Sequence, residues 1–174
     1  DMRAPAALRE INPLGKSPAI RDGDLVMIES GAIAEYIINR HGGGRLGVPV
    51  SSPDYPAYLQ WMHFSEGSAM LQFVLSLFVG GFIPDIDQSS PFVESTKAET
   101  ANLLRFLEGE IKGKAYFAGG AFTAADIMMV YCFRIVRGFL KTDMSPYPSL
   151  TAWIDRVEGR PAYKKAMAIA NEKG

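Results

Sequence analysis

The stretch of sequence that decides the fold covers residues 12–33 and reads NPLGKSPAIRDGDLVMIESGAI. It predicts a loop, a strand entered through Pro18, a tight turn at Asp22-Gly23, a second strand and a helix. Glycine takes a positive φ without a Cβ penalty, so Asp22-Gly23 between two short apolar runs is a strong hairpin signal. Serine is a preferred N-cap residue, so we expect Ser30 to cap the helix that follows.

The second strand, residues 25–28 (LVMI), contains no polar residue. An apolar run of this kind predicts that both faces of the strand are covered. A two-stranded hairpin is marginal in water, so it needs further strands beside it and a helix on each side. The residues before it supply only a short helical piece around Ala6 to Ile11. We therefore expect the chain to begin partway through an α/β domain.

Everything after Ser52 has helical periodicity, which predicts a second, all-helical domain. Helices are expected over about 54–82 and 91–112, from Thr123, after Pro148 and from Pro161. The glycine-rich residues 41–49 (HGGGRLGVP) are typical of a helix stop followed by a linker. The expected organisation is a partial α/β domain over 1–44, a linker over 45–52 and a helical domain over 53–174.

The sequence Thr123-Ala124-Ala125-Asp126 is the clearest local motif of the helical part. Thr123 at an N-cap and Asp126 three residues later predict a capping box, in which each side chain bonds the other residue's amide. This structural role accounts for an acidic residue in an otherwise apolar segment.

Composition excludes several classes of function. The 174 residues carry a formal net charge of −1 without a long run of one sign, which argues against binding nucleic acid or anionic membranes. A single cysteine, Cys132, cannot form an internal disulfide, and only His41 and His63 are available as histidine ligands. We therefore expect no metal site and a protein of a reducing compartment, the cytoplasm.

Four features occur together in order along the chain: the Asn-Pro-x-Gly-Lys-x-Pro loop, Glu29-Ser30-Gly31, the capped helix at Thr123, and Arg160-Pro161-Ala162. Together they resemble the cytosolic glutathione S-transferase family, of the bacterial type. The resemblance implies a thioredoxin-like N-terminal domain that binds glutathione and an all-helical C-terminal domain that supplies most of a hydrophobic pocket. It also implies a homodimer, a role in detoxification and glutathione as co-substrate, with no metal.

The family places its thiol-activating Tyr, Ser or Cys near the first strand or first helix of the domain. This sequence contains neither element, and the resemblance implies that the first βαβ unit is missing from it. We therefore assign no catalytic nucleophile or thiol activator.

Glutathione carries an ammonium and a carboxylate at its γ-glutamyl end and a second carboxylate at its glycine end. Ser30 at a helix start suits the first carboxylate, because free amides and the helix dipole favour an anion. Glu29 can accept from the ammonium. A cis bond at Ser17-Pro18 would turn the Ser17 main chain outward to pair with the cysteinyl backbone. Lys16 can neutralise the glycine carboxylate.

In the helical part, Glu66 lies about where the family often places an acid that reaches glutathione across the dimer interface. It can equally be a solvated residue on a helix face. The candidate walls of the hydrophobic pocket are Trp61, Phe64, Ser65, Met70, Met128 and Tyr131. Aromatic and methionine side chains at helical spacing are also ordinary core residues.

Three functions stay open at this point. The first is glutathione transfer, in which the thiolate attacks a small hydrophobic electrophile. The second is an interaction module of the same fold without catalysis. The third is a glutathione-dependent lyase, isomerase or dehalogenase that uses the same site. Because Lys16, Ser17-Pro18 and Glu29-Ser30 occur together, the first is favoured over the second.

Overall fold

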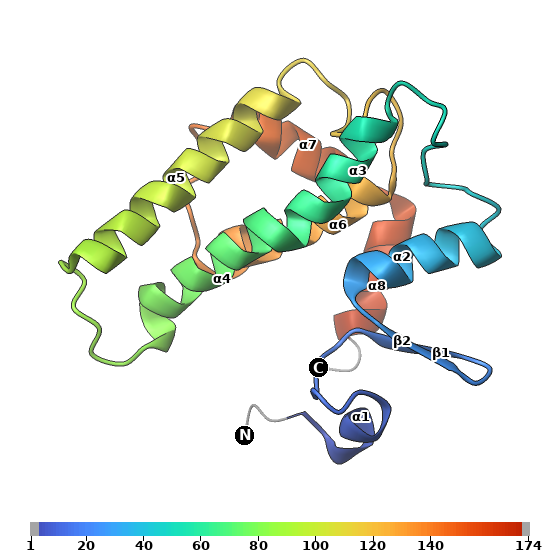
Figure 1. Ribbon diagram of the computed structural model, residues 1–174. Helices are drawn as coiled ribbons and strands as arrows, with labels where there is room; N and C mark the ends of the chain where they lie inside the picture. Colours follow the sequence, from blue (N-terminus) through green and yellow to red (C-terminus); the bar gives the residue numbers. More distant parts are fainter. Residues whose placement is uncertain (1–3, 172–174) are drawn as a thin grey trace. The chain divides into compact units, whose positions relative to one another are not determined.

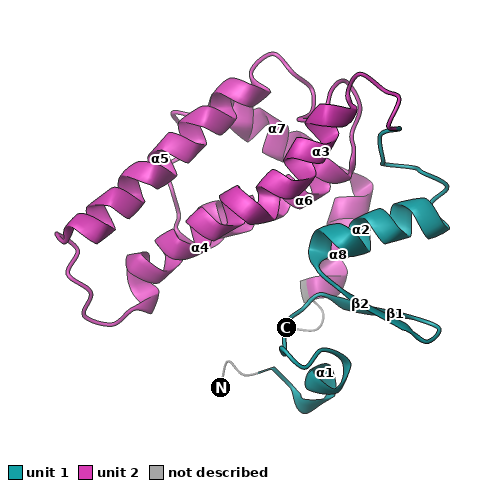
Figure 2. Cartoon of the chain, viewed as in Figure 1, with its two compact units in different colours: residues 1–49 teal, residues 50–174 magenta. Residues whose placement is uncertain are grey.

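The computed structural model describes residues 4–171, and the chain divides into two compact units (Figure 2). Unit 1 covers residues 1–49 and unit 2 covers residues 50–174. The division therefore falls inside the segment 45–52 that the sequence predicts as a linker. Among the described residues, no helix is both long and apolar enough to cross a membrane.

Unit 1 is a hairpin preceded by one helix and followed by another. Its elements are α1 (Ala6–Ile11), β1 (Ala19–Asp22), β2 (Leu25–Ile28), α2 (Ser30–Tyr36) and the π-helical η1 (Ile37–His41). The strands are antiparallel, with Ala19 opposite Ile28 and Asp22 opposite Leu25. The two-residue turn is Gly23-Asp24, and Gly23 has a φ of +59° that a side chain would strain. The predicted hairpin and its proline entry are confirmed, and the turn lies one residue later than the predicted Asp22-Gly23, because Asp22 still pairs with Leu25.

Within the described chain the apolar strand is not covered on both faces, since Leu25 is 44% exposed and Val26 39%. This agrees with the expectation that the hairpin needs further strands beside it. Between residues 4 and 171 the sheet has only these two strands, so no third strand covers the side chains near the turn.

One expectation is wrong, and it concerns the start of α2. Ser30 is the first residue of the helix, and the N-cap position belongs to Glu29, whose side chain makes no capping hydrogen bond. The Glu29 carbonyl accepts the first helical bond, from the Ile33 amide at 2.9 Å. Glu29 has a φ of +77°, so the chain turns into the helix one residue earlier than the serine predicts.

Unit 2 is all-helical, as the sequence predicts. Its first helical run is continuous, from α3 (Tyr55–Phe64) through η2 (Ser65–Met70) and α4 (Leu71–Leu77) to η3 (Phe78–Phe82). Ser90 caps α5 (Pro91–Ile111), which runs antiparallel to this first run (Figure 1). The chain then forms α6 (Ala124–Arg134), η4 (Ile135–Phe139), α7 (Pro148–Glu158) and α8 (Pro161–Asn171).

Aromatic rings make the centre of unit 2. The ring centroid of Phe117 lies 4.5 Å from that of Trp61 and 4.8 Å from that of Trp153. The ring centroids of Trp153 and Phe133 are 5.8 Å apart. All four side chains are buried. Such edge and tilted contacts add to the free energy gained by burying the rings. The helix α6 runs through this centre, which explains why its sequence is apolar on nearly every side.

Cys132 lies on α6 with no exposed surface, and its thiol donates to the Ser65 carbonyl at 3.3 Å. Burial, with a smaller contribution from the negative charge of Glu66, raises the pKa of Cys132 to about 12. The thiol therefore stays protonated and inaccessible, which is typical of a structural cysteine.

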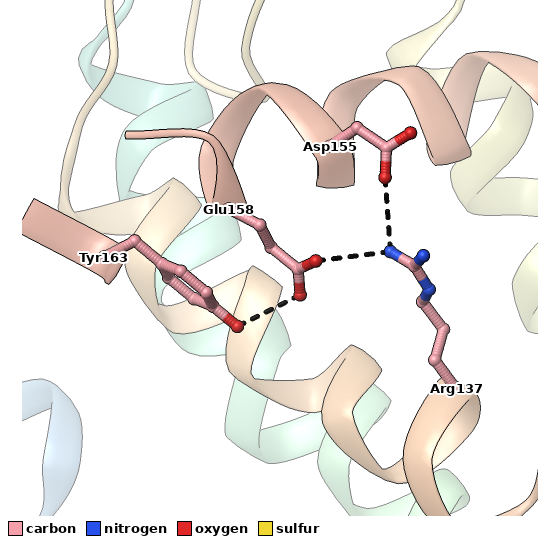
Figure 3. Close-up of polar contacts among 4 residues, drawn as sticks. All are labelled: Arg137, Asp155, Glu158 and Tyr163. Atoms are coloured by element: carbon pink, nitrogen blue, oxygen red, sulfur yellow. Dashed lines mark hydrogen bonds and ion pairs between the residues drawn. The ribbon is translucent and has the colours of Figure 1, made fainter. Parts of the chain in front are cut away.

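Polar contacts join the last two helices, α7 and α8, to Arg137 of η4. Arg137 contacts the carboxylates of Asp155 and Glu158 on α7, each at 3.3 Å, and Tyr163 on α8 donates to Glu158 at 3.0 Å (Figure 3). Because Arg137 and Asp155 are partly exposed, this cluster fixes orientation more than it adds stability.

Candidate functional site

The loop that precedes β1 is folded around a buried amide. Asn12 is 2% exposed, its Nδ2 donates to the Lys16 carbonyl at 2.8 Å, and its Oδ1 accepts from the Leu14 amide at 3.1 Å. Gly15 closes the same turn with a φ of +63° and donates to the Asn12 carbonyl at 2.7 Å. These bonds hold Lys16 and the residues after it in one arrangement.

The register of the hairpin brings the two predicted binding segments to one end of the sheet. Ala19 pairs with Ile28, so Ser17 and Ser30 each stand two residues beyond the last pair, at the end away from the turn. The bond between Ser17 and Pro18 is cis. Within residues 4–171 the Ser17 amide and carbonyl make no hydrogen bond, and both residues are exposed. This main chain is free to pair with an extended ligand.

The start of α2 offers donors at the same end. Within the described chain, the backbone amides of residues 30–32 donate to no acceptor, and the Ser30 hydroxyl accepts no hydrogen bond from a backbone amide at the helix start. Because α2 continues without a break into η1, the helical run covers residues 30–41. Unpaired amides at the start of such a run, together with the helix dipole, favour a carboxylate or another anion.

Charges of both signs flank these groups. Lys16 and Glu29 are exposed, and neither side chain forms an ion pair with any described residue. Glu29 adopts its positive φ although it is not glycine, a conformation that costs free energy and clusters at functional sites. The site thus presents a cation on one side and an anion beside free amides on the other.

A polar contact at the opposite end of the hairpin holds β1 against the helix. The Asp22 carboxylate accepts from the Tyr36 hydroxyl at 2.8 Å and lies 2.7 Å from Nε2 of His41. The Tyr36 hydroxyl and then His41 lower the pKa of Asp22. These contacts fix the position of the hairpin against α2 and η1, and with it the position of Ser17 relative to Ser30.

Comparison with known proteins agrees with this arrangement. Residues 1–45 match the family model "Glutathione S-transferase, N-terminal domain", and residues 70–161 match "Glutathione S-transferase, C-terminal domain". Glutathione S-transferase 3 of Schizosaccharomyces pombe is 34% identical over 186 residues, covering 99% of this chain and 74% of that protein. The chain belongs to the glutathione S-transferase family.

Solved glutathione S-transferases share the fold. A glutathione S-transferase of Actinobacillus pleuropneumoniae superposes with a TM-score of 0.80 at 27% identity, covering 98% of this chain and 74% of its own. A sphingomonad glutathione S-transferase complexed with glutathione gives a TM-score of 0.76 at 28% identity, covering 96% and 81%. The predicted family and its two-part fold, thioredoxin-like and then all-helical, are confirmed.

The candidate residues of the helical unit differ in exposure. Trp61, Ser65 and Met128 are buried in the core, Phe64 and Met70 are half-buried, and Tyr131 is 57% exposed. Glu66 is exposed on η2. Trp61 and Ser65 have almost no surface to offer a ligand in this unit, whereas Phe64, Met70 and Tyr131 do. Their role as pocket walls stays a prediction, as does the cross-subunit role of Glu66.

Capping at Thr123 and Asp126 is present, and Asp126 does more than cap. Its carboxylate accepts from the Thr123 amide at 3.0 Å, and also from the Phe117 amide and the Trp153 indole. Sequence reasoning assigned only the local bond, because the other two come from residues distant along the chain.

The sequence assigns no role to two features of the candidate site. One is Asn12, whose buried amide shapes the loop; an asparagine before a proline is a turn signal that could have indicated it. The other is the positive φ of Glu29, which no sequence signal indicates. No group of three or more His, Cys, Asp or Glu side chains within residues 4–171 is placed to hold a metal ion.

Proposed function

We propose that this protein is a glutathione transferase that binds glutathione through Lys16, Ser17, Pro18, Glu29 and Ser30. The observation that carries the proposal is the hairpin register, which places the free Ser17 main chain and the unpaired amides at Ser30 at one end of the sheet. The γ-glutamyl carboxylate bonds the start of α2, and Glu29 accepts from the ammonium. The cysteinyl backbone pairs with Ser17, and Lys16 faces the glycine carboxylate.

The proposed reaction is attack by the glutathione thiolate on an electrophilic carbon of a small apolar compound. The carbon–sulfur bond forms as the leaving group departs with its electron pair, or as an adjacent double bond accepts the electrons. A thiol with an ordinary pKa of ~8.5 is mostly protonated at neutral pH, so stabilising the thiolate accelerates the step. Residues 1–44 supply the glutathione site, and residues 53–174 supply the apolar pocket.

The remaining parts of the proposal follow the family. We propose a cytoplasmic homodimer in which Glu66 of one subunit reaches the γ-glutamyl ammonium bound to the other. A strictly monomeric protein, measured by light scattering, would remove the role of Glu66 and leave the Ser17 and Ser30 contacts in place.

The first test is glutathione binding by the intact protein, measured by isothermal titration calorimetry. Ser30→Ala should weaken binding about tenfold, because it removes a hydrogen bond to a charged group. Lys16→Gln should weaken it only about two- to fivefold, as expected of an exposed ion pair. Ser95→Ala, at an exposed serine of α5 in unit 2 that is not one of the proposed binding residues, is the matched control and should leave binding unchanged.

Absence of binding by the intact wild-type protein at millimolar glutathione would overturn the assignment and favour the non-catalytic interaction module. Binding without conversion of 1-chloro-2,4-dinitrobenzene would favour another glutathione-dependent reaction at the same site, such as a lyase, isomerase or dehalogenase reaction. Binding with release of chloride and formation of the thioether supports the proposal.

A further inference from the structure

A cavity of about 270 Å³ lies within unit 2, between the end of the first helical run, α5 and the segment 140–147 that leads to α7. None of the residues proposed to bind glutathione lines it. Its volume is slightly below the range of about 300–1,000 Å³ that is common for small-molecule sites. It therefore suits a ligand of one ring or a short chain.

Part of the wall of this cavity is apolar. Val79 from η3 and Leu104 from α5 each expose only 1% of their surface, and Ala101 and Leu140 complete this apolar part. The other side chains of the lining are polar: Ser76, Lys97, Thr100, Thr142 and Tyr147. Gly80 contributes no side chain, and a Cβ there would lie 3.4 Å from Leu140. A hydrocarbon body can be buried against the apolar side chains.

The polar groups of the wall are already hydrogen-bonded to one another. Thr100 Oγ1 donates to the Thr96 carbonyl at 2.9 Å and accepts from Gln72 Nε2 at 3.0 Å, and Ser76 Oγ bonds to both Thr100 and the Gln72 carbonyl. Each hydroxyl proton in this network has an acceptor. The wall therefore offers no free donor beside Ser76 and Thr100, and this part of the ligand must be apolar.

The only charged side chain among the lining residues is Lys97. Its ammonium donates to Gln88 Oε1 at 3.0 Å, and Gln88 in turn donates to the Val79 carbonyl at 2.8 Å. A neutral amide thus positions the ammonium without neutralising it. No carboxylate lines the cavity, so its electrostatic preference is for an anion.

Tyr147 adds a polar group to the same lining. The residue as a whole is 8% exposed, and its hydroxyl forms no hydrogen bond with a side chain or carbonyl of residues 4–171. The hydroxyl oxygen is not one of the buried polar atoms that lack a partner, so it keeps accessible surface. It can therefore also bond an oxygen of a ligand in the cavity.

We propose that this cavity binds a small organic carboxylate, with the carboxylate at Lys97 and the apolar body against Val79 and Leu104. The binding is independent of glutathione, because the lining residues belong to unit 2 alone. A neutral or cationic compound of the same size would lack the contact with Lys97.

The test uses hexanoate, hexan-1-ol and hexylammonium with the intact protein in the absence of glutathione. For ligands of eight or so heavy atoms we expect a Kd of about 1 mM for hexanoate, measured by calorimetry. Hexan-1-ol should bind about fivefold more weakly, and hexylammonium more weakly still. Amide shifts in a ¹⁵N NMR titration should be largest at Val79, Thr100 and Tyr147.

Two variants separate charge from shape. Lys97→Gln should weaken hexanoate about fivefold and leave hexan-1-ol unchanged, whereas Lys165→Gln, an exposed lysine of α8, should change neither. Ala101→Leu, which fills the cavity, should weaken both ligands, with circular dichroism confirming that the helices are retained.

Equal binding of hexanoate and hexan-1-ol by the wild-type protein would overturn the preference for an anion. Shifts located away from the cavity, or no binding of hexanoate at tenfold above the expected Kd, would overturn the site itself. Since glutathione is absent from the titration, none of these outcomes depends on the proposed transferase function.

Discussion

The indole Nε1 of Trp153 donates to Oδ1 of Asp126 at 3.0 Å, and neither side chain has any exposed surface. The same oxygen accepts from the Phe117 amide at 3.1 Å, and Oδ2 accepts from the Thr123 amide at 3.0 Å. A single carboxylate therefore joins the start of α6, the segment before it and α7. It connects the centre of unit 2 through donors that would otherwise be buried without an acceptor.

Asp126→Asn should destabilise the protein by about 2–4 kcal/mol, because its amide nitrogen must face donors that now bond to a carboxylate oxygen. The measurement is the free energy of unfolding from urea denaturation. Asp143→Asn is the matched control, since within residues 4–171 that exposed carboxylate accepts only from Ser145 in a turn, and it should change stability by less than about 0.5 kcal/mol. Similar losses for both variants would show that Asp126 acts only as a local cap.

Gly119 cannot accept a side chain. Its φ is +105°, and a Cβ built there would lie 2.7 Å from Oδ2 of Asp54. Gly119→Ala should therefore cost about 1–3 kcal/mol of stability, from backbone strain and the displacement of Asp54. Gly120→Ala should be nearly neutral, because a Cβ at Gly120 has no neighbour within 4 Å. The melting temperatures of the two variants can be compared directly by thermal denaturation. Equal melting temperatures would contradict the steric argument.

Local patterns in the sequence predict most of the fold. Ala6–Ile11 is helical as expected, the strands flank a glycine turn, and proline marks the starts of α5, α7 and α8. These features depend on residues within a few positions of one another. Turn chemistry and helix periodicity therefore suffice to predict them.

Properties set by distant residues could not be predicted in the same way. The exposure of Leu25 and Val26 depends on which elements lie beside the hairpin, and an apolar run reports only a tendency to be covered. The N-cap at Glu29 depends on a backbone torsion that a flexible acidic residue does not indicate. For the site, the sequence predicts the residues at one end of the hairpin, but the loop bonds of Asn12 become apparent only in three dimensions.

Two substitutions at Glu29 distinguish the effect of its side chain on glutathione binding from the effect of its backbone conformation on stability. Glu29→Gly and Glu29→Ala both remove the carboxylate, so both should weaken glutathione binding to the same extent in calorimetry. Glycine accepts the φ of +77° without a Cβ penalty, so Glu29→Gly should be about 1 kcal/mol more stable than Glu29→Ala. If the alanine variant were the more stable one, the positive φ would not be a source of strain.

Asp22 should give unit 1 a pH-dependent stability. The Tyr36 hydroxyl and His41 hold the pKa of Asp22 below its ordinary value of 3.8, so the unfolded chain binds this proton more readily than the folded chain. The stabilisation is therefore fully present above the ordinary pKa and is lost as the pH falls through the lower, folded value.

A carbon-13 NMR titration of the Asp22 carboxyl should give a midpoint below 3.8. Tyr36→Phe should raise that midpoint, because it removes a hydrogen bond that lowers the pKa of the carboxyl, whereas Asp24→Asn in the adjacent turn should not. The difference in unfolding free energy between the wild-type protein and Asp22→Asn should shrink as the pH is lowered past the same midpoint, and a difference that grew under acid would reverse the sign of the argument.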